Sequence, residues 1–125
     1  MTAKTNNLPL YLSLYKLTQY FYLLTSNFRK EYKYTLGQSI LDFGWDTLDL
    51  TLLANSLPNQ EKAKEIRRLS CKFDQLKTRL RMAYELKLIS HKRYAFIIEK
   101  NEETGKMING WLKWAKTQKC QKAQT

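Results

Sequence analysis

The stretch LYLSLYKLTQYFYLLTSNF, residues 10–28, places apolar side chains at alternating steps of four and three. That spacing gathers them on one stripe of an α-helix, which is typical of a seam packed against other helices. Pro9 suits the first turn of such a helix. The pattern therefore predicts a helix over about residues 9–29. Its core positions are Leu10, Leu14, Leu17, Phe21, Leu24 and Phe28.

The same spacing returns twice in the second half of the chain. It predicts a third helix over about 59–88, with the core row Ala63, Ile66, Leu69, Phe73, Leu76, Leu80 and Ala83. A fourth helix is expected over about 90–116, capped by Ser90. Its core side would carry Tyr94, Ile98, Asn101, Gly105, Ile108, Leu112 and Ala115, with Trp111 and Trp114 beside them. The polar tail 117–125 is expected to fray.

The pattern of residues 35–55 predicts the second helix. Thr35 followed by Gln38 matches a capping box. Two apolar rows predict a broad buried face: Leu36, Ile40, Phe43, Thr47 and Leu50, and beside them Leu41, Trp45, Leu48 and Leu52. The remaining polar edge carries Asp42, Asp46 and Asp49.

Four helices with short connections predict an all-α fold, an antiparallel up-down-up-down four-helix bundle in a single domain over 1–125. No apolar stretch is long enough to span a membrane, and the N-terminus does not read as a secretion signal. Cys71 and Cys120 are interpreted as two reduced thiols, which places the protein in the cytoplasm.

The three aspartates could hold a metal or carry acid–base chemistry. However, the one histidine, His91, stands in a basic cluster, and no Glu-x-x-His pattern, glycine-rich phosphate loop or nucleophile motif occurs. We therefore expect no metal, no cofactor and no enzyme. The aspartates are interpreted as an exposed edge that faces a basic edge in the same chain or in a neighbouring subunit. Trp45 beside them is expected in the core or in a subunit contact, rather than as a platform for stacking bases.

The net charge of +11 lies almost wholly in the second half of the chain. Residues 1–57 carry 5 Lys and Arg against 4 Asp and Glu, a net +1, and residues 58–125 carry 17 against 7, a net +10. Such asymmetry indicates a polyanionic partner and favours nucleic acid over a membrane surface.

Most of that charge falls on the third helix, which carries Lys62, Lys64, Arg67, Arg68, Lys72, Lys77, Arg79, Arg81 and Lys87. Within this set a strip from Lys64 to Arg79 would be about 22 Å long and could meet several phosphates. A second basic spot, Lys92 and Arg93, stands at the start of the fourth helix, where an anion would relieve the conflict with the helix dipole. In both places the alternative is a solvated basic surface, on the third helix compensated in part by acids one turn away.

Three segments carry a resemblance to a known family. They are 35-TLGQSILDFGWDTLDLTLLANSLPNQEKA-63, 76-LKTRLRMAYELKLISHKRYAFI-97 and the run Gly110-Trp111-Leu112. With them the chain, over about residues 8–116, resembles the accessory variability determinants of diversity-generating retroelements. These belong to a wider four-helix-bundle family that includes proteins encoded in intervening sequences of bacterial ribosomal RNA genes.

The resemblance implies a homopentameric barrel that binds a reverse transcriptase, template-repeat RNA and RNA/cDNA and supports mutagenic retrohoming without being the polymerase. It favours Arg79 and Arg81 as nucleic-acid contacts. Two alternatives stay open, an RNA-associated bundle of the ribosomal intervening-sequence type and a structural or protein-docking bundle whose basic face only solubilises it. The candidate nucleic-acid-binding residues are Arg79, Arg81, Lys77, Lys72, Arg68, Arg67, Lys64, Lys92 and Arg93.

Overall fold

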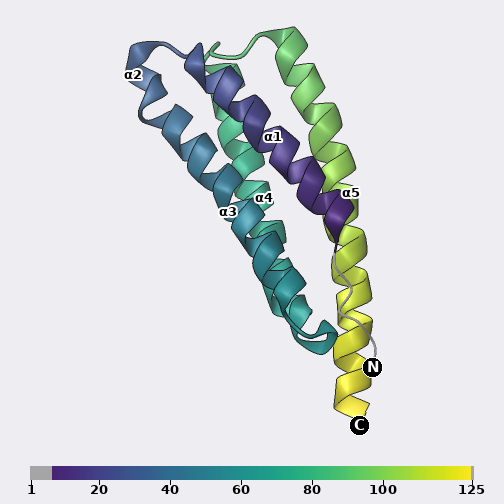
Figure 1. Ribbon diagram of the computed structural model, residues 1–125. Coiled ribbons are helices and arrows are strands. Elements are labelled where there is room, and N and C mark those ends of the chain that lie inside the picture. The colour runs from purple at the N-terminus through teal and green to yellow at the C-terminus, as the bar shows by residue number, and fades with distance from the viewer. Residues whose placement is uncertain (1–6, 125) are drawn as a thin grey trace.

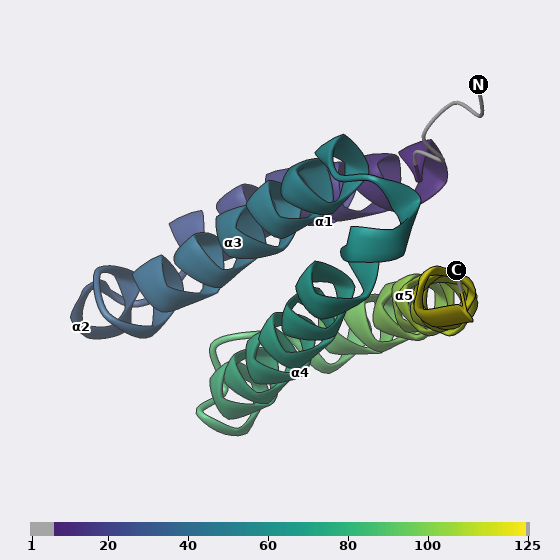
Figure 2. The same cartoon turned by 90° about the horizontal axis from the view of Figure 1, so that it is seen from below.

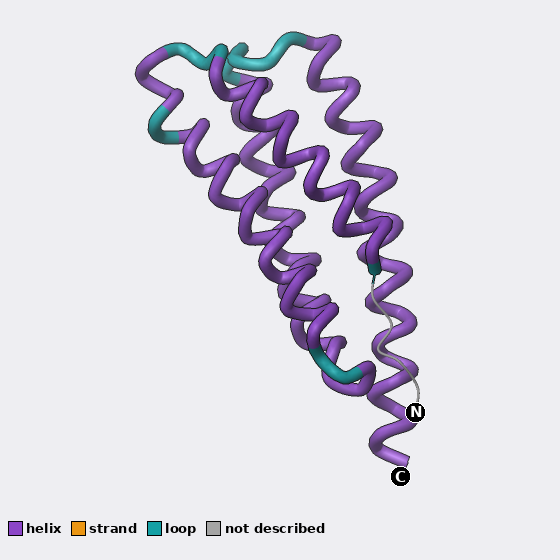
Figure 3. Tube along the Cα trace, viewed as in Figure 1, coloured by secondary structure: helices purple, strands orange, loops and turns teal. Residues whose placement is uncertain are grey.

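A computed structural model describes residues 7–124, with side chains as far as Gln118, and nearly all of this part of the chain is helical (Figure 3). None of these residues lies in a β-strand, so the all-α prediction is confirmed for them. The long helices are α1 (Leu8–Ser26), α3 (Leu36–Ser56), α4 (Lys62–Glu85) and α5 (His91–Gln124). The short α2 (Lys30–Lys33) follows α1, and the 3-10 turn η1 (Asn59–Glu61) precedes α4.

The long helices lie in two pairs, which are clearest when the molecule is seen from below (Figure 2). α1 packs against α3, α4 packs against α5, and the contact between α3 and α4 joins the pairs. α1 and α3 connect through α2 at one end of the molecule, whereas α3 and α4 connect through η1 at the other (Figure 1). α5 extends beyond its expected end at Lys116, into the segment expected to fray, and is helical to Gln124. No helix in the described residues is both long and apolar enough to cross a bilayer.

The predicted core rows of α1 and α4 are confirmed. All six seam residues of α1 and the next turn are buried, as are all seven of α4, and they join one cluster with side chains from α3 and α5. Both rows stay within one stripe because the spacing of four and three matches the helical period.

The second row predicted for α3 is wrong at two of its four positions: Leu48 is buried and Leu41 is half-buried, but the other two residues face solvent. Trp45 and Leu52 are 46% and 52% exposed. Small residues turn inward instead, because α3 lies very close to α1: a Cβ added at Gly44 would be 3.1 Å from Thr18 Oγ1. The inward side of α3 consists of Gly37, Ile40, Gly44, Thr47, Leu48, Leu50, Thr51 and Ala54.

The buried face of α5 agrees with the expected one at every other position and is displaced by one residue in between. Ile98 is 42% exposed, and Ile97 lies in the core in its place. Asn101, Ile108 and Ala115 are buried as predicted. The buried set is Ile97, Asn101, Thr104, Ile108, Trp111 and Ala115, again in steps of four and three.

The helix ends confirm one predicted cap and contradict another. Ser90 Oγ accepts a hydrogen bond from the backbone N–H of Arg93 at 3.2 Å, as an N-cap of α5 does. Thr35, by contrast, makes no side-chain cap to α3. Its hydroxyl donates to the carbonyl of Glu31 at 3.2 Å, because α2 places that carbonyl one turn away, and Gln38 donates to Asp42 Oδ1.

Lys62 does not belong to the basic surface, because its side chain is fully buried. Its Nζ donates to the carbonyl oxygens of Ala54 at 2.6 Å and Asn55 at 3.2 Å. These carbonyls belong to the last turn of α3, which carries the negative end of the helix dipole, and that of Ala54 also accepts from the backbone N–H of Leu57 at 3.2 Å. Lys62 therefore ties the start of α4 to the end of α3.

Candidate nucleic-acid interface

The structure separates the nine candidate residues by exposure. The side chains of Lys64, Arg67, Arg68, Lys77, Arg81, Lys92 and Arg93 are exposed. Lys72 and Arg79 are half-buried, because they lie on the side of α4 that meets α3. The predicted strip is thus not a uniform basic surface.

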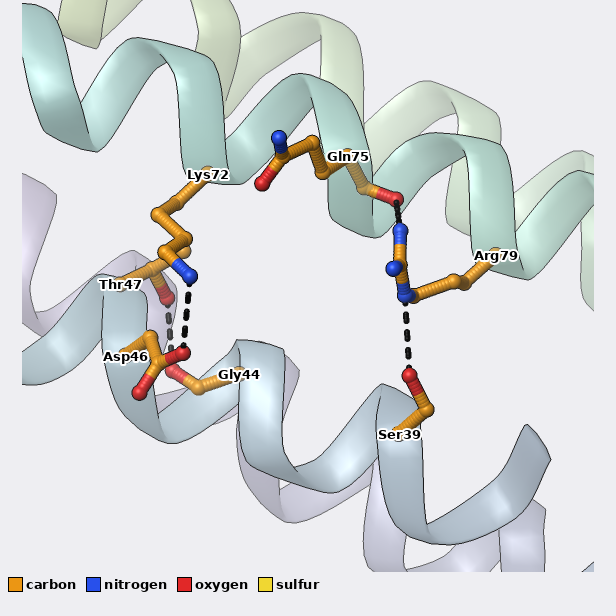
Figure 4. A network of polar contacts seen from close by, with 7 residues as sticks. All are labelled: Ser39, Gly44, Asp46, Thr47, Lys72, Gln75 and Arg79. Atoms are coloured by element: carbon orange, nitrogen blue, oxygen red, sulfur yellow. Dashed lines mark hydrogen bonds and ion pairs between the residues drawn. The ribbon is translucent and has the colours of Figure 1, made fainter. Parts of the chain in front are cut away.

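Arg79 is held within the fold (Figure 4). Its Nε donates to Ser39 Oγ on α3 at 2.9 Å, and one terminal nitrogen donates to the carbonyl of Gln75 at 3.0 Å. The guanidinium carbon lies 3.8 Å from the centre of the Phe43 ring. Two of the five N–H donors of this guanidinium are thus used within the fold, and the ring contact holds the group against α3.

Lys72 makes a parallel contact two turns earlier (Figure 4). Its Nζ lies 3.4 Å from Asp46 Oδ2 and 4.6 Å from the centre of the same Phe43 ring. Phe43 is therefore covered by two cations of α4, and Asp46 provides the counter-charge. The expected meeting of the acidic and basic edges within the chain is confirmed for Asp46.

The other aspartates lie apart from that contact. Asp42 and Asp49 are exposed, as expected, and Asp42 accepts its hydrogen bond from Gln38 at 2.9 Å. Among the described residues no three His, Cys, Asp or Glu side chains are grouped to hold a metal ion. Trp45, expected in the core or a subunit contact, is on the surface, where its Nε1 donates to Tyr22 OH on α1 at 2.9 Å.

Three exposed cations of α4 each form an ion pair with an acidic residue of the same helix. Arg68 lies 2.8 Å from Glu65, Lys77 lies 3.1 Å from Asp74, and Arg81 lies 3.5 Å from Glu85. Exposed pairs of this kind stabilise by only about 0–1 kcal/mol, so a phosphate can displace the acid. Lys64 and Arg67 make no ion pair within the described residues.

The first half of α4 gathers the basic residues around a shallow hollow. We call this surface the α4 hollow, and it is lined by Lys64, Arg67, Arg68, Cys71, Lys72 and Gln75. Of the strip predicted from Lys64 to Arg79, the part from Lys64 to Gln75 lines the hollow, whereas Arg79 does not. The sequence did not indicate Cys71 and did not place Arg67 in the strip, because each lies one position before a residue of that strip.

Two predicted groups lie away from the α4 hollow. Arg79 and Arg81, the residues that the resemblance favoured, do not line it. Lys92 and Arg93 are in the first turn of α5, beyond the end of α4 that is far from the hollow. Along α4 alone, Arg68 in the hollow and Glu85 at that far end are about 25 Å apart. Near that end, Tyr84 OH and His91 Nδ1 share a hydrogen bond of 3.0 Å.

The geometry defines an all-helical bundle with basic side chains concentrated on α4 and at the start of α5. The chain belongs to the bAvd-like family, whose sequence model matches residues 10–115. This match confirms the resemblance to accessory variability determinants. No curated protein and no solved structure matches the chain.

Proposed function

We propose that this protein is a non-catalytic accessory subunit of a diversity-generating retroelement. In the cytoplasm it binds nucleic acid and the reverse transcriptase and supports mutagenic cDNA synthesis and retrohoming. The observation that carries the proposal is the α4 hollow, an exposed basic surface on a chain of the bAvd-like family.

The α4 hollow suits contact with phosphates. Lys64 and Arg67 make no ion pair in the described structure, and Arg68 is exposed although its partner, Glu65, has a side chain that is only 14% exposed. The arginine forks can each grip a phosphate with two hydrogen bonds. Lys72 lines the hollow as well, but its charge is compensated in part by Asp46, so the exposed cations carry most of the contact.

The proposal includes an antiparallel up-down-up-down protomer that assembles into a homopentameric barrel and contacts the reverse transcriptase. Exposed apolar side chains support a protein-binding surface, since contiguous apolar surface on a bundle is typical of interfaces. α1 has a single charged residue, Lys16. Its exposed apolar side chains are Leu8, Leu12, Tyr15, Tyr22 and Leu23.

The test is an anisotropy titration of protein of known oligomeric mass across a salt series. The labelled probes are a structured RNA carrying the template repeat, an unrelated structured RNA and a DNA–RNA hybrid. We expect saturable binding whose logarithm falls steeply with the logarithm of salt, by about 0.7–0.9 for each phosphate contacted. Reconstitution with the reverse transcriptase should then give a complex of defined mass.

Flat, weak binding to all three probes at low salt would overturn the nucleic-acid part of the proposal. It would favour a structural or protein-docking bundle whose basic surface only solubilises it. Saturable RNA binding without any complex with the reverse transcriptase would instead favour an RNA-associated bundle of the ribosomal intervening-sequence type.

A further inference from the structure

A second groove runs between α4 and α5, apart from the α4 hollow. Its volume is about 390 Å³, within the range of small-molecule sites. No residue of the α4 hollow lines it. The lining residues that matter here are Lys77, Tyr94, Asn101, Glu102, Gly105 and Lys106.

Asn101 is a polar residue in the wall of this groove. The residue is only 7% exposed, and its Oδ1 is enclosed without a hydrogen-bond partner. That oxygen is too enclosed to meet a ligand, so the group that we assign to base contact is the amide nitrogen, a hydrogen-bond donor. An unpaired buried oxygen costs stability, so Asn101 is not explained by a stabilising role in the fold.

An aromatic ring is held in place on one wall. Tyr94 stacks on Tyr84 with ring centres 4.2 Å apart and planes 11° apart. Tyr84 is fixed in turn by its hydrogen bond with His91. A ring fixed in this way keeps its orientation, and an aromatic side chain of defined orientation is the usual platform for an unstacked base.

The charges around the groove suit a nucleotide. Lys77 and Lys106 provide cations, and Lys77 has only the exposed Asp74 as its ion-pair partner. Glu102 provides an acceptor beside the amide donor of Asn101, so the groove offers both kinds of hydrogen bond to the edge of a base.

We propose that the groove between α4 and α5 binds one unpaired base of a single-stranded nucleic acid. The base lies against Tyr94 and hydrogen-bonds with Asn101 and Glu102, while Lys77 and Lys106 hold the flanking phosphates. This inference rests on the proposed nucleic-acid binding and adds a base-contacting site to it. The α4 hollow binds backbone, whereas the groove admits only strands with a free base.

Gly105 offers a way to fill the groove without disturbing the fold. A Cβ added there would lie 3.8 Å from the nearest atom, Cε2 of Phe73, which is an ordinary contact. A larger side chain therefore extends into the groove. Gly110, on the same helix, provides a matched control, because a Cβ there meets nothing within 4 Å and the residue does not line the groove.

The test compares two labelled oligomers of equal length, oligocytidine and the same backbone without bases. Wild-type protein should bind oligocytidine at least about fivefold more tightly, because stacking of a single base on an aromatic ring supplies at least that factor. Gly105→Leu should remove this preference and leave binding of the abasic oligomer unchanged. Gly110→Leu should keep the preference.

Asn101→Leu provides a second variant of nearly the same shape. It removes the enclosed oxygen that lacks a partner, so the melting temperature should hold or rise. The preference for oligocytidine over the abasic oligomer should nevertheless fall several-fold. A structural role for Asn101 would instead lower the melting temperature and leave the preference intact.

The experiments distinguish failure of the proposed base site from failure of the proposed function. If wild-type protein binds both oligomers equally and in a salt-dependent way, the groove does not bind a base, but the proposed function is unaffected. A preference that survives Gly105→Leu and Asn101→Leu would also overturn the proposed base site, since the base would then be bound elsewhere. If wild-type protein binds neither oligomer and no structured RNA, both proposals fail.

Discussion

The guanidinium of Arg79 on α4 lies over the ring of Phe43 on α3, with 3.8 Å between the guanidinium carbon and the ring centre. With the hydrogen bond to Ser39, this contact makes Arg79 part of the join between the two helix pairs. The residue that the family resemblance favoured as a nucleic-acid contact thus helps to hold the bundle together.

Arg79→Ala should therefore act mainly on stability. We expect a loss of about 1–3 kcal/mol in the free energy of unfolding, because a cation–π contact and two hydrogen bonds are removed. Urea denaturation followed by circular dichroism measures this loss. Affinity for RNA, measured where the variant is fully folded, should change less than twofold. Unchanged stability with much weaker RNA binding would show that Arg79 contacts phosphate after all.

Arg67→Ala with Arg68→Ala tests the α4 hollow. Both side chains are exposed, so the fold should keep its helicity and melting temperature within a few degrees. The slope of log affinity against log salt should become shallower by about 0.7–0.9 for each phosphate that the variant no longer binds. The matched control is Lys92→Ala with Arg93→Ala, which removes the same formal charge at the start of α5. An equal effect of the two pairs would mean that net charge, and not the hollow, determines binding.

Lys62→Met should destabilise the turn between α3 and α4. The thioether fills much of the lysine stem's volume but leaves the carbonyls of Ala54 and Asn55 without this donor. The carbonyl of Ala54 keeps the backbone N–H of Leu57 as a donor, but losing the charged hydrogen bonds from Lys62 costs about 1–3 kcal/mol. Thermal and urea unfolding measure the loss, and Lys62→Arg, which keeps the donor and the charge, should recover part of it. Equal stability of Lys62→Met and the wild type would show that desolvating the ammonium cancels its hydrogen bonds.

Gly44 and Gly110 should respond in opposite directions to alanine. A Cβ at Gly44 would press on Thr18 and Phe21 at 3.1–3.4 Å, so Gly44→Ala should lower stability by about 1 kcal/mol despite its better helix propensity. Gly110→Ala has open space and should raise stability by about 0.5–1 kcal/mol. The melting temperature of each variant, compared with that of the wild type, gives the sign of its change in stability. A stabilising Gly44→Ala would mean that α1 and α3 can separate slightly at no cost.

How far the sequence predicts this fold depends on which property determines each helix face. On α1 and α4 the buried side chains are mostly large and apolar, so their period gives the core directly. On α3 the close approach to α1 leaves room only for small side chains, so Gly44, Thr47 and Thr51 are buried. A prediction based on hydrophobicity instead places Trp45 and Leu52 in the core, which is wrong because both are exposed. On α5 two adjacent isoleucines, Ile97 and Ile98, fit the same period, and only the packing decides between them.

The candidate site is harder to predict, because it depends on partners distant in sequence. Arg79 looks like any exposed arginine until Ser39, 40 positions earlier, is placed beside it. Lys62 is similar, since nothing local indicates that its ammonium ends beneath the last turn of α3. Most residues of the α4 hollow were predictable because helical spacing alone brings Lys64, Arg68 and Lys72 together.

The split between a nearly neutral first half and a +10 second half makes the molecule an electric dipole as well as a cation. α3 contains three aspartates and no lysine or arginine, and it belongs to the pair opposite α5 (Figure 2). In the field of a polyanion such a body experiences a torque before it makes any contact. On the proposed function, the protein would thus turn its α4–α5 pair toward a nucleic acid before contact, with the α1–α3 pair behind it (Figure 2).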